Sequence, residues 1–190
     1  FSLRWYKNLF EDEATLKALY NTVILAVCSS VIATVLGTAA AVGIDKFKKG
    51  PIRSGVMATT NIPMMNPDIV TGISMMLLFG FVGTALRVCG DKLNFWTILI
   101  AHVPFCLPYV YLSITPRLRQ MDKHLTEAAQ DLVCTPLQSF FKVELPFIMP
   151  GIISGMIMAF TLSLDDFVIS YFTTSESEFT TLPILIYSMT

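Results

Sequence analysis

Charged residues are scarce in this sequence, and that scarcity decides the class of protein first. Only 14% of the 190 residues are charged, whereas a soluble domain usually carries about a quarter. Apolar residues make up 54% and the mean hydropathy is +0.64. These values exclude an ordinary soluble domain, and we expect an all-α, polytopic bundle of transmembrane helices.

Several motifs that indicate other functions are also missing. There is no basic block to bind nucleic acid, and the formal net charge is -1. No GxxxxGK[ST] phosphate loop is present, so we expect any ATP hydrolysis on another subunit. The four cysteines show no CxxC spacing, which supports neither a zinc site nor a disulfide framework: Cys28, Cys89, Cys106 and Cys134. We expect no catalytic or metal site on this chain.

Four apolar stretches are long enough to cross a bilayer, which takes about 20 residues. We place them at about 21–44, 56–82, 95–114 and 147–171, with a fifth beginning at about 182. They form one membrane domain over residues 1–190. Because the chain begins without Met and stops inside an apolar run, we expect a fragment of a longer protein.

Small and helix-breaking residues mark where these spans contact protein. Small side chains recur every four residues at Ser29, Ala33, Gly37 and Ala41, and a GxxxG pair lies in the fourth span. Such stripes let helix backbones approach closely. The second span contains breaking or polar residues that require partners inside protein or a wet cavity: Asn61, Pro63, Asn66, Pro67 and Asp68.

A long polar loop, residues 115–146, separates the third and fourth spans. Lys and Arg are concentrated in this loop and in residues 45–55, so the positive-inside tendency places both in the cytoplasm. Within the loop, Asp122 precedes a short amphipathic helix with the apolar stripe Met121, Leu125, Ala128 and Leu132.

A second short helix is predicted by a capping box, with Thr135 as N-cap, Pro136 at the first position and Gln138 three residues after the cap. Its apolar face comprises Leu137, Phe140, Phe141 and Leu145. The pattern fits either an ordinary loop with interfacial helices or a docking site for a partner in the cytoplasm.

The loop also carries a sequence signature. EAAQDL, followed by VELP, resembles the EAA signature of bacterial ABC importer permeases. The resemblance implies an ATPase-coupling role for the residues that match or adjoin the motif: Glu127, Ala128, Ala129, Asp131, Leu132, Val133, Val143, Leu145 and Pro146. The signature has Gly where this chain has Val133, and a β-branched residue suits a left-handed turn poorly. The turn therefore has either another conformation or some strain.

Further runs are similar to PotC-type permeases for spermidine and putrescine: NIPMMNPDIVTG, TLSLDDFVISYFTT and TLPILIYSM. The resemblance implies a type I importer permease, here without its first span and part of its last, in the bacterial cytoplasmic (inner) membrane. It also implies three partners: a dimer of ATP-binding subunits that holds ATP and Mg²⁺, a second homologous permease, and an extracytoplasmic polyamine-binding protein. No cofactor is expected on this chain.

Three carboxylates are candidates for the path of a polycation: Asp68, Asp165 and Asp166. Each costs about 3 kcal/mol at a bilayer centre, so we expect them to face a wet interior. The alternative is that they cap broken helices or pair with buried donors. Adjacent helical residues point about 100° apart, so Asp165 and Asp166 cannot aim at one spot on a regular helix.

Aromatic residues and one histidine leave further alternatives open. Trp96 and Tyr109 are either cation-binding faces in the substrate path or anchors at the membrane interface. His102 is an ionisable group inside a predicted span. It either has a functional role or forms a hydrogen bond with a backbone carbonyl that Pro104 leaves free. The identity of the cargo is also left open, because an EAA loop indicates coupling to an ATPase and does not identify the transported solute. Ferric ion, sulfate or an organic anion are alternative cargoes, although three acidic residues disfavour an anion. A second alternative is a channel or a membrane scaffold, which would not stimulate an ATPase.

Overall fold

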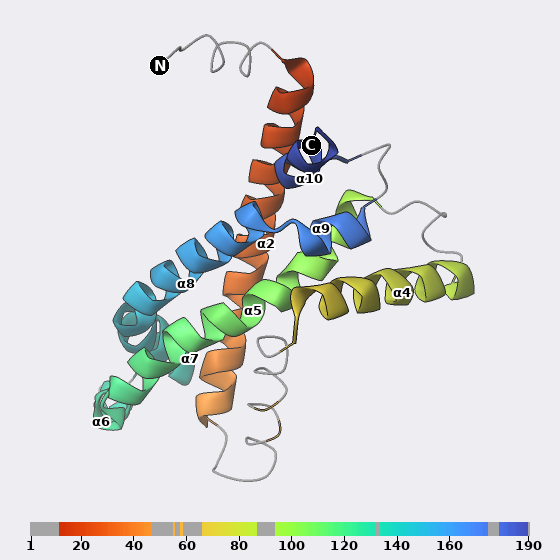
Figure 1. The fold of residues 1–190 in the computed structure, drawn as a ribbon. Helices are drawn as coiled ribbons and strands as arrows, with labels where there is room; N and C mark the ends of the chain where they lie inside the picture. The colour runs from red at the N-terminus through yellow and green to blue at the C-terminus, as the bar shows by residue number, and fades with distance from the viewer. Residues whose placement is uncertain are drawn as a thin grey trace.

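The computed structural model describes residues 12–46, 55, 58, 66–86, 94–131, 134–174 and 179–189. Every regular element in these ranges is helical, which confirms the all-α prediction (Figure 1). The elements are α2 (Glu13–Lys46), α4 (Asp68–Leu86), α5 (Phe95–Gln120), α6 (Lys123–Asp131), α7 (Pro136–Ser139), the π-helix η1 (Phe140–Glu144), α8 (Leu145–Asp165), α9 (Val168–Thr173) and α10 (Leu182–Ser188).

The core is formed by α2, α5 and α8, which pack against one another. The stripe of small residues on α2 is buried, which confirms that this face packs on protein: Ser29, Ala33, Gly37 and Ala41. A methyl group added at Gly37 would lie 2.8 Å from Val110 on α5, and one at Gly155 would lie 3.1 Å from the Val110 backbone. Both glycines therefore permit close contact with α5.

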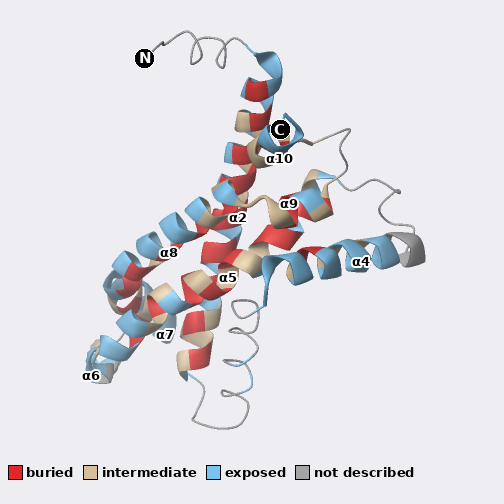
Figure 2. Ribbon diagram, viewed as in Figure 1, coloured by how far each residue is buried: buried red, intermediate tan, exposed pale blue. Residues whose placement is uncertain are grey.

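Three further helices, α4, α9 and α10, are attached to this core. α4 packs on α9, where Gly72 meets Phe172 and the carbonyl of Val168. α10 lies against α2, and the Leu182 amide donates to the Thr22 hydroxyl at 2.8 Å. At the start of α2, the Asp12 carboxylate accepts from the Thr15 hydroxyl, and this bond lowers the pKa of Asp12. Much of α4 and the outer face of α8 are exposed (Figure 2).

Three helical stretches in the described residues are long and apolar enough to cross a membrane, namely Glu13–Lys46, Phe95–Gln120 and Pro136–Asp165. α4 begins at Asp68, whereas most of the first half of the stretch expected at 56–82 lies outside the described residues. The third stretch continues to Gln120, because Pro116 is accommodated inside α5.

The stretch expected at 147–171 is not one helix. α8 ends at Asp165, Asp166 has an extended backbone (ψ 119°), and α9 starts two residues later. The break has a local cause, since the Asp166 side chain accepts hydrogen bonds from amides in the first turn of α9. An acceptor at this place competes with continuation of the helix.

The polar segment, defined here as residues 121–144, has the predicted caps. The Asp122 carboxylate accepts from the His124 amide at 3.0 Å, and the capping box between Thr135 and Gln138 is complete. Beyond α7, however, the helix does not stop before the membrane span. It passes through η1 directly into α8, and the π-turn widens the helix just before Pro146, which has no N–H to donate.

Candidate functional site

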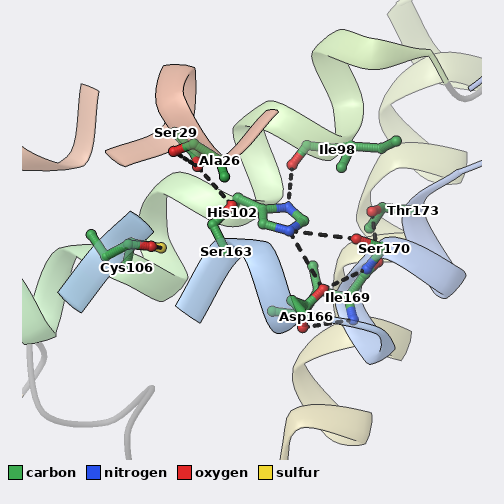
Figure 3. Close-up of polar contacts among 11 residues, drawn as sticks. Ala26, Ser29, Ile98, His102, Cys106, Ser163, Asp166, Ile169, Ser170 and Thr173 are labelled. Carbon is green, nitrogen blue, oxygen red and sulfur yellow. Dashed lines mark hydrogen bonds and ion pairs between the residues drawn. The ribbon is translucent and has the colours of Figure 1, made fainter. Parts of the chain in front are cut away.

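Asp166 is held inside the protein at the junction of α8 and α9. Its two oxygens accept from the amides of Ser170 (2.9 Å) and Ile169 (3.4 Å). Oδ2 also lies 3.4 Å from Nε2 of His102 on α5, and the two side chains are 5% and 0% exposed (Figure 3). Asp166 thus joins three elements, and we call His102 and Asp166 the central pair.

The ring nitrogen of His102 that carries the hydrogen can be inferred from the hydrogen-bond partners of the ring. Nδ1 lies 2.9 Å from the carbonyl oxygen of Ile98, which can only accept, so Nδ1 carries a hydrogen. In a neutral ring Nε2 is then an acceptor, facing the Ser170 hydroxyl at 3.5 Å and Asp166. A hydrogen bond between His102 and Asp166 therefore requires one further proton, on Nε2 or on the carboxyl group.

Asp165 differs from its neighbour in environment. It is exposed at the last position of α8, and no ion pair is found for it among the described residues. Asp68, the first residue of α4, is also exposed, one turn before the contact of Gly72 with α9. The adjacent aspartates therefore face different surroundings. The 100° separation expected on a regular helix does not apply here, because α8 ends at Asp165 and Asp166 has an extended backbone.

Three aromatic rings form a cluster that includes a residue of this junction. Phe167, Tyr171 and Tyr187 contact one another with ring centroids 5.0 to 5.9 Å apart, and we call them the ring cluster. The other two aromatic candidates lie on α5, Trp96 exposed next to Phe95 and Tyr109 half-buried beside Phe105. Neither belongs to the ring cluster.

In the polar segment, most of the candidate coupling residues reach the surface. Glu127 is 72% exposed in its side chain and contacts His124 at 3.2 Å. Ala128, Asp131 and Pro146 are exposed, whereas Ala129, Val143 and Leu145 are half-buried. Leu132 and Val133 lie outside the described residues, so the conformation at the usual Gly position stays a prediction. Large apolar side chains of the polar segment are exposed as well: Leu125, Leu137 and Phe141.

A second ion pair joins the polar segment to α2. Nζ of Lys46, the last residue of α2, lies 3.4 Å from Oε2 of Glu144, the last residue of η1. The Glu144 side chain is 6% exposed and that of Lys46 is 59% exposed. We call Lys46 and Glu144 the corner pair.

Sequence reasoning missed both pairings. His102 was considered with a carbonyl freed by Pro104, which would be that of Ile100, but its ring bonds the Ile98 carbonyl and faces Asp166. Lys46 was counted only as a loop charge. Glu144 lies within VELP. Its carboxylate in an otherwise apolar run was the feature of the sequence that could have indicated a buried ion pair.

Comparison with known proteins gives consistent matches. A family model described as "Binding-protein-dependent transport system inner membrane component" matches residues 33–190. The putrescine transport system permease protein PotI of Escherichia coli K12 is 43% identical over 188 residues, covering 99% of this chain and 66% of that protein.

Two further relatives carry a related name. The spermidine/putrescine transport system permease protein PotC of Escherichia coli K12 is 37% identical over 100% of this chain and 68% of its own length. PotC of Haemophilus influenzae is 36% identical over 100% of this chain and 70% of its own length. This chain therefore spans about two thirds of the length of the relatives it matches.

Proposed function

Because the chain belongs to the family of binding-protein-dependent transport system inner membrane components, we propose that it is the permease subunit of an ATP-driven polyamine importer. Family membership confirms the resemblance based on EAAQDL and VELP, and the inner-membrane location with it. A transport subunit is not itself an enzyme, so the proposal assigns ATP hydrolysis to a separate ATP-binding subunit with its Mg²⁺. No cofactor is assigned to this chain.

The 43% identity to a putrescine permease over 99% of the chain carries the choice of cargo. The site chemistry agrees with that choice. Putrescine and spermidine are flexible polycations, and a polycation needs carboxylates and aromatic faces in place of water. We assign the cargo contact to Asp165, since its carboxylate is exposed while that of Asp166 is occupied by His102 and two amides.

The ring cluster supports the same position for the cargo. Phe167 follows Asp165 by two residues and contacts both tyrosines, and Tyr171 and Tyr187 are 42% and 60% exposed. An ammonium group within about 6 Å of an aromatic face is attracted by the ring. A diamine could thus place one ammonium at Asp165 and hold a second against these rings.

At the other end of the same helical run, the polar segment is proposed to dock an ATPase subunit. Glu127 is exposed, and the mutually contacting elements α6, α7 and η1 also expose the apolar side chains of Leu125, Leu137 and Phe141. A segment that exposes both a charged group and large apolar side chains is suited to a protein partner. The helical run Pro136–Asp165 spans 30 residues, about 45 Å, from this surface to Asp165.

This continuity suggests how the two sites communicate. Closure of the ATPase dimer would move α6 and α7, and α7 continues through η1 into α8. The movement would reach the α8–α9 junction, which opens alternately to either side of the membrane. A second homologous permease and an extracytoplasmic polyamine-binding protein complete the proposed transporter.

Cargo is tested by uptake in cells that lack their own polyamine importers and express the complete transporter. We expect accumulation of radiolabelled putrescine or spermidine, and a loss of at least about tenfold in Asp165→Asn, equal to about 1.4 kcal/mol. Glu13→Gln, which neutralises an exposed carboxylate in the first turn of α2, is the matched control and should retain uptake. Accumulation of ferric ion or sulfate instead of polyamine would replace the cargo assignment.

Coupling is tested by Glu127→Ala and Glu127→Lys in the same complex. Both should weaken association with the ATP-binding subunit and reduce uptake, since a docking carboxylate is lost or reversed. Gln130→Ala on the same helix is the control. Normal uptake and assembly in both Glu127 variants would remove the docking role, and absence of any ATPase partner would favour a channel or scaffold.

A further inference from the structure

The corner pair connects two parts of the chain that the backbone does not connect directly. The polar segment follows α5 and leads into α8, so any movement of α6 and α7 reaches both helices through the backbone. α2 ends far earlier in the sequence, at Lys46. Its end is joined to η1 by the 3.4 Å contact with Glu144 and by the Phe140 ring, whose centroid lies 5.6 Å from Nζ.

The surroundings of Lys46 attract its ammonium group. Lys46 lies in the last turn of α2, where the helix dipole attracts a cation. A small cavity beside it is lined by residues of four elements: Val42, Asp45 and Lys46 of α2, Leu118 of α5, Met121, Thr126 and Glu127 around α6, and Glu144 of η1. The lining thus includes three carboxylates and one cation, and the most buried carboxylate, Glu144, contacts that cation.

Burial makes the contact more than an ordinary surface ion pair. Glu144 is 5% exposed, so its charge requires a partner, whereas exposed pairs contribute little. The π-turn contributes to the geometry: the Leu145 amide donates to the Phe140 carbonyl, five residues earlier, and Phe140 and Glu144 both contact Lys46. The ammonium thus lies between the first and last residues of η1.

We propose that Lys46 is a positioning residue that transmits movement of the polar segment to the end of α2. Its ammonium, held by the Glu144 carboxylate and the Phe140 ring, makes α2 follow η1 when the ATPase subunits close. This inference rests on the proposed function and extends it, because it adds a third helix to those that respond to ATP.

The first test measures coupling in the complete transporter reconstituted in proteoliposomes. Lys46→Met alone leaves a buried carboxylate without its partner and is expected to impair folding. The double variant Lys46→Met, Glu144→Gln removes both charges and should assemble. We expect it to hydrolyse ATP but to transport at least about fivefold less cargo per ATP, the lower range of coupling between sites.

Two further variants make this result specific. Lys46→Arg keeps the cation and should keep cargo transported per ATP near the wild-type value. Lys142→Met removes an exposed lysine from the same π-helix and should leave the ratio unchanged. Wild-type coupling in the double variant, or an equal loss in Lys142→Met, would overturn the proposal.

The second test does not depend on cargo. In a background without native cysteines, spin labels are placed at Gly43, where an added side chain meets open space, and at exposed Gln130 on α6. The distance distribution in the assembled complex should be narrow in the wild type and in Lys142→Met, and broader in the double variant. An equally narrow distribution in the double variant would contradict the link, whereas a failure of polyamine uptake in the wild type would contradict only the cargo.

Discussion

The central pair and the corner pair join carboxylates to basic side chains on other helices, but their settings differ. In the central pair both side chains are buried, at 0% and 5% exposure, and Asp166 has two further amide donors. In the corner pair only Glu144 is buried, and Lys46 extends into an open cavity. The first arrangement fixes a helix junction, while the second permits its cation to follow a moving partner.

This contrast has an energetic basis. Removing one partner of a buried pair leaves a desolvated charge and typically costs about 3–5 kcal/mol. A pair with one exposed partner keeps part of its hydration and is partly screened by salt. We therefore expect substitutions in the central pair to affect stability, and substitutions that neutralise the whole corner pair to affect coupling.

The largest effect is expected for Asp166→Ala. This change removes the acceptor of two amides and the partner of His102, and should lower stability by about 3–5 kcal/mol. Thermal unfolding of the purified complete transporter measures it. Asp166→Asn retains an acceptor oxygen and should lose less.

Asp165→Asn is the matched control for this stability measurement, since the neighbouring carboxylate is exposed. It should lose uptake without a change in unfolding temperature. Equal unfolding temperatures for Asp166→Ala and Asp165→Asn would remove the distinction between the two aspartates.

A smaller effect is expected along α2, which carries Lys46 at its end and packs on α5, the helix of His102. Gly37→Ala places a methyl group 2.8 Å from Val110 and should cost about 1–3 kcal/mol. Gly43→Ala, where nothing lies within 4 Å, should be neutral or stabilising by up to about 1 kcal/mol. Unfolding temperatures of the two variants test the difference, and a neutral Gly37→Ala would mean that the two helices are not tightly packed.

Thr135→Ala should act only near the corner pair. It removes one half of the capping box and should destabilise α7 by about 1 kcal/mol. Hydrogen exchange of the amides of residues 135–139 in the complete transporter should become faster, while the α8–α9 junction remains protected. Gln130→Ala, outside the cap, is the control, and faster exchange at both ends would show that the regions are not independent.

The smallest effect concerns salt. Raising ionic strength from about 0.1 M to about 1 M shortens the screening length from about 10 Å to about 3 Å. The stability difference between the wild type and Lys46→Met, Glu144→Gln should therefore shrink, by less than about 1 kcal/mol. The difference between the wild type and Asp166→Ala should not change with salt, and a parallel decrease would contradict the burial of the central pair.

Local patterns predicted the helices and their caps well, because these depend on neighbours in the sequence. The small-residue stripe at Ser29 to Ala41 and the capping box at Thr135 are both confirmed. The run from 147 to 171 is largely apolar and was therefore predicted as one span, with capping of a broken helix as the alternative role of its aspartates. The structure supports that alternative for Asp166, which accepts from amides in the first turn of α9. Its contact with His102, a residue far away in the sequence, was not predicted.

The residue types of the candidate site were predicted from the sequence, but the residues with which they pair were not. The three carboxylates and Glu127 were identified, and the structure separates them by environment: Asp165 is exposed and Asp166 is enclosed. Lys46 and Glu144 could not be paired from the sequence, since nothing in either local pattern indicates that the end of α2 meets η1. Such pairings follow from the packing of α2, α5 and α8.

The π-turn of η1 has a consequence for how this gene can vary in length. One extra residue per turn rotates everything before η1 by about 100° relative to α8. Deleting a single codon within 140–144 would restore a regular helix but turn α7 and its exposed side chains toward a different direction. We therefore expect insertions and deletions to be excluded from these five residues even where substitutions are accepted.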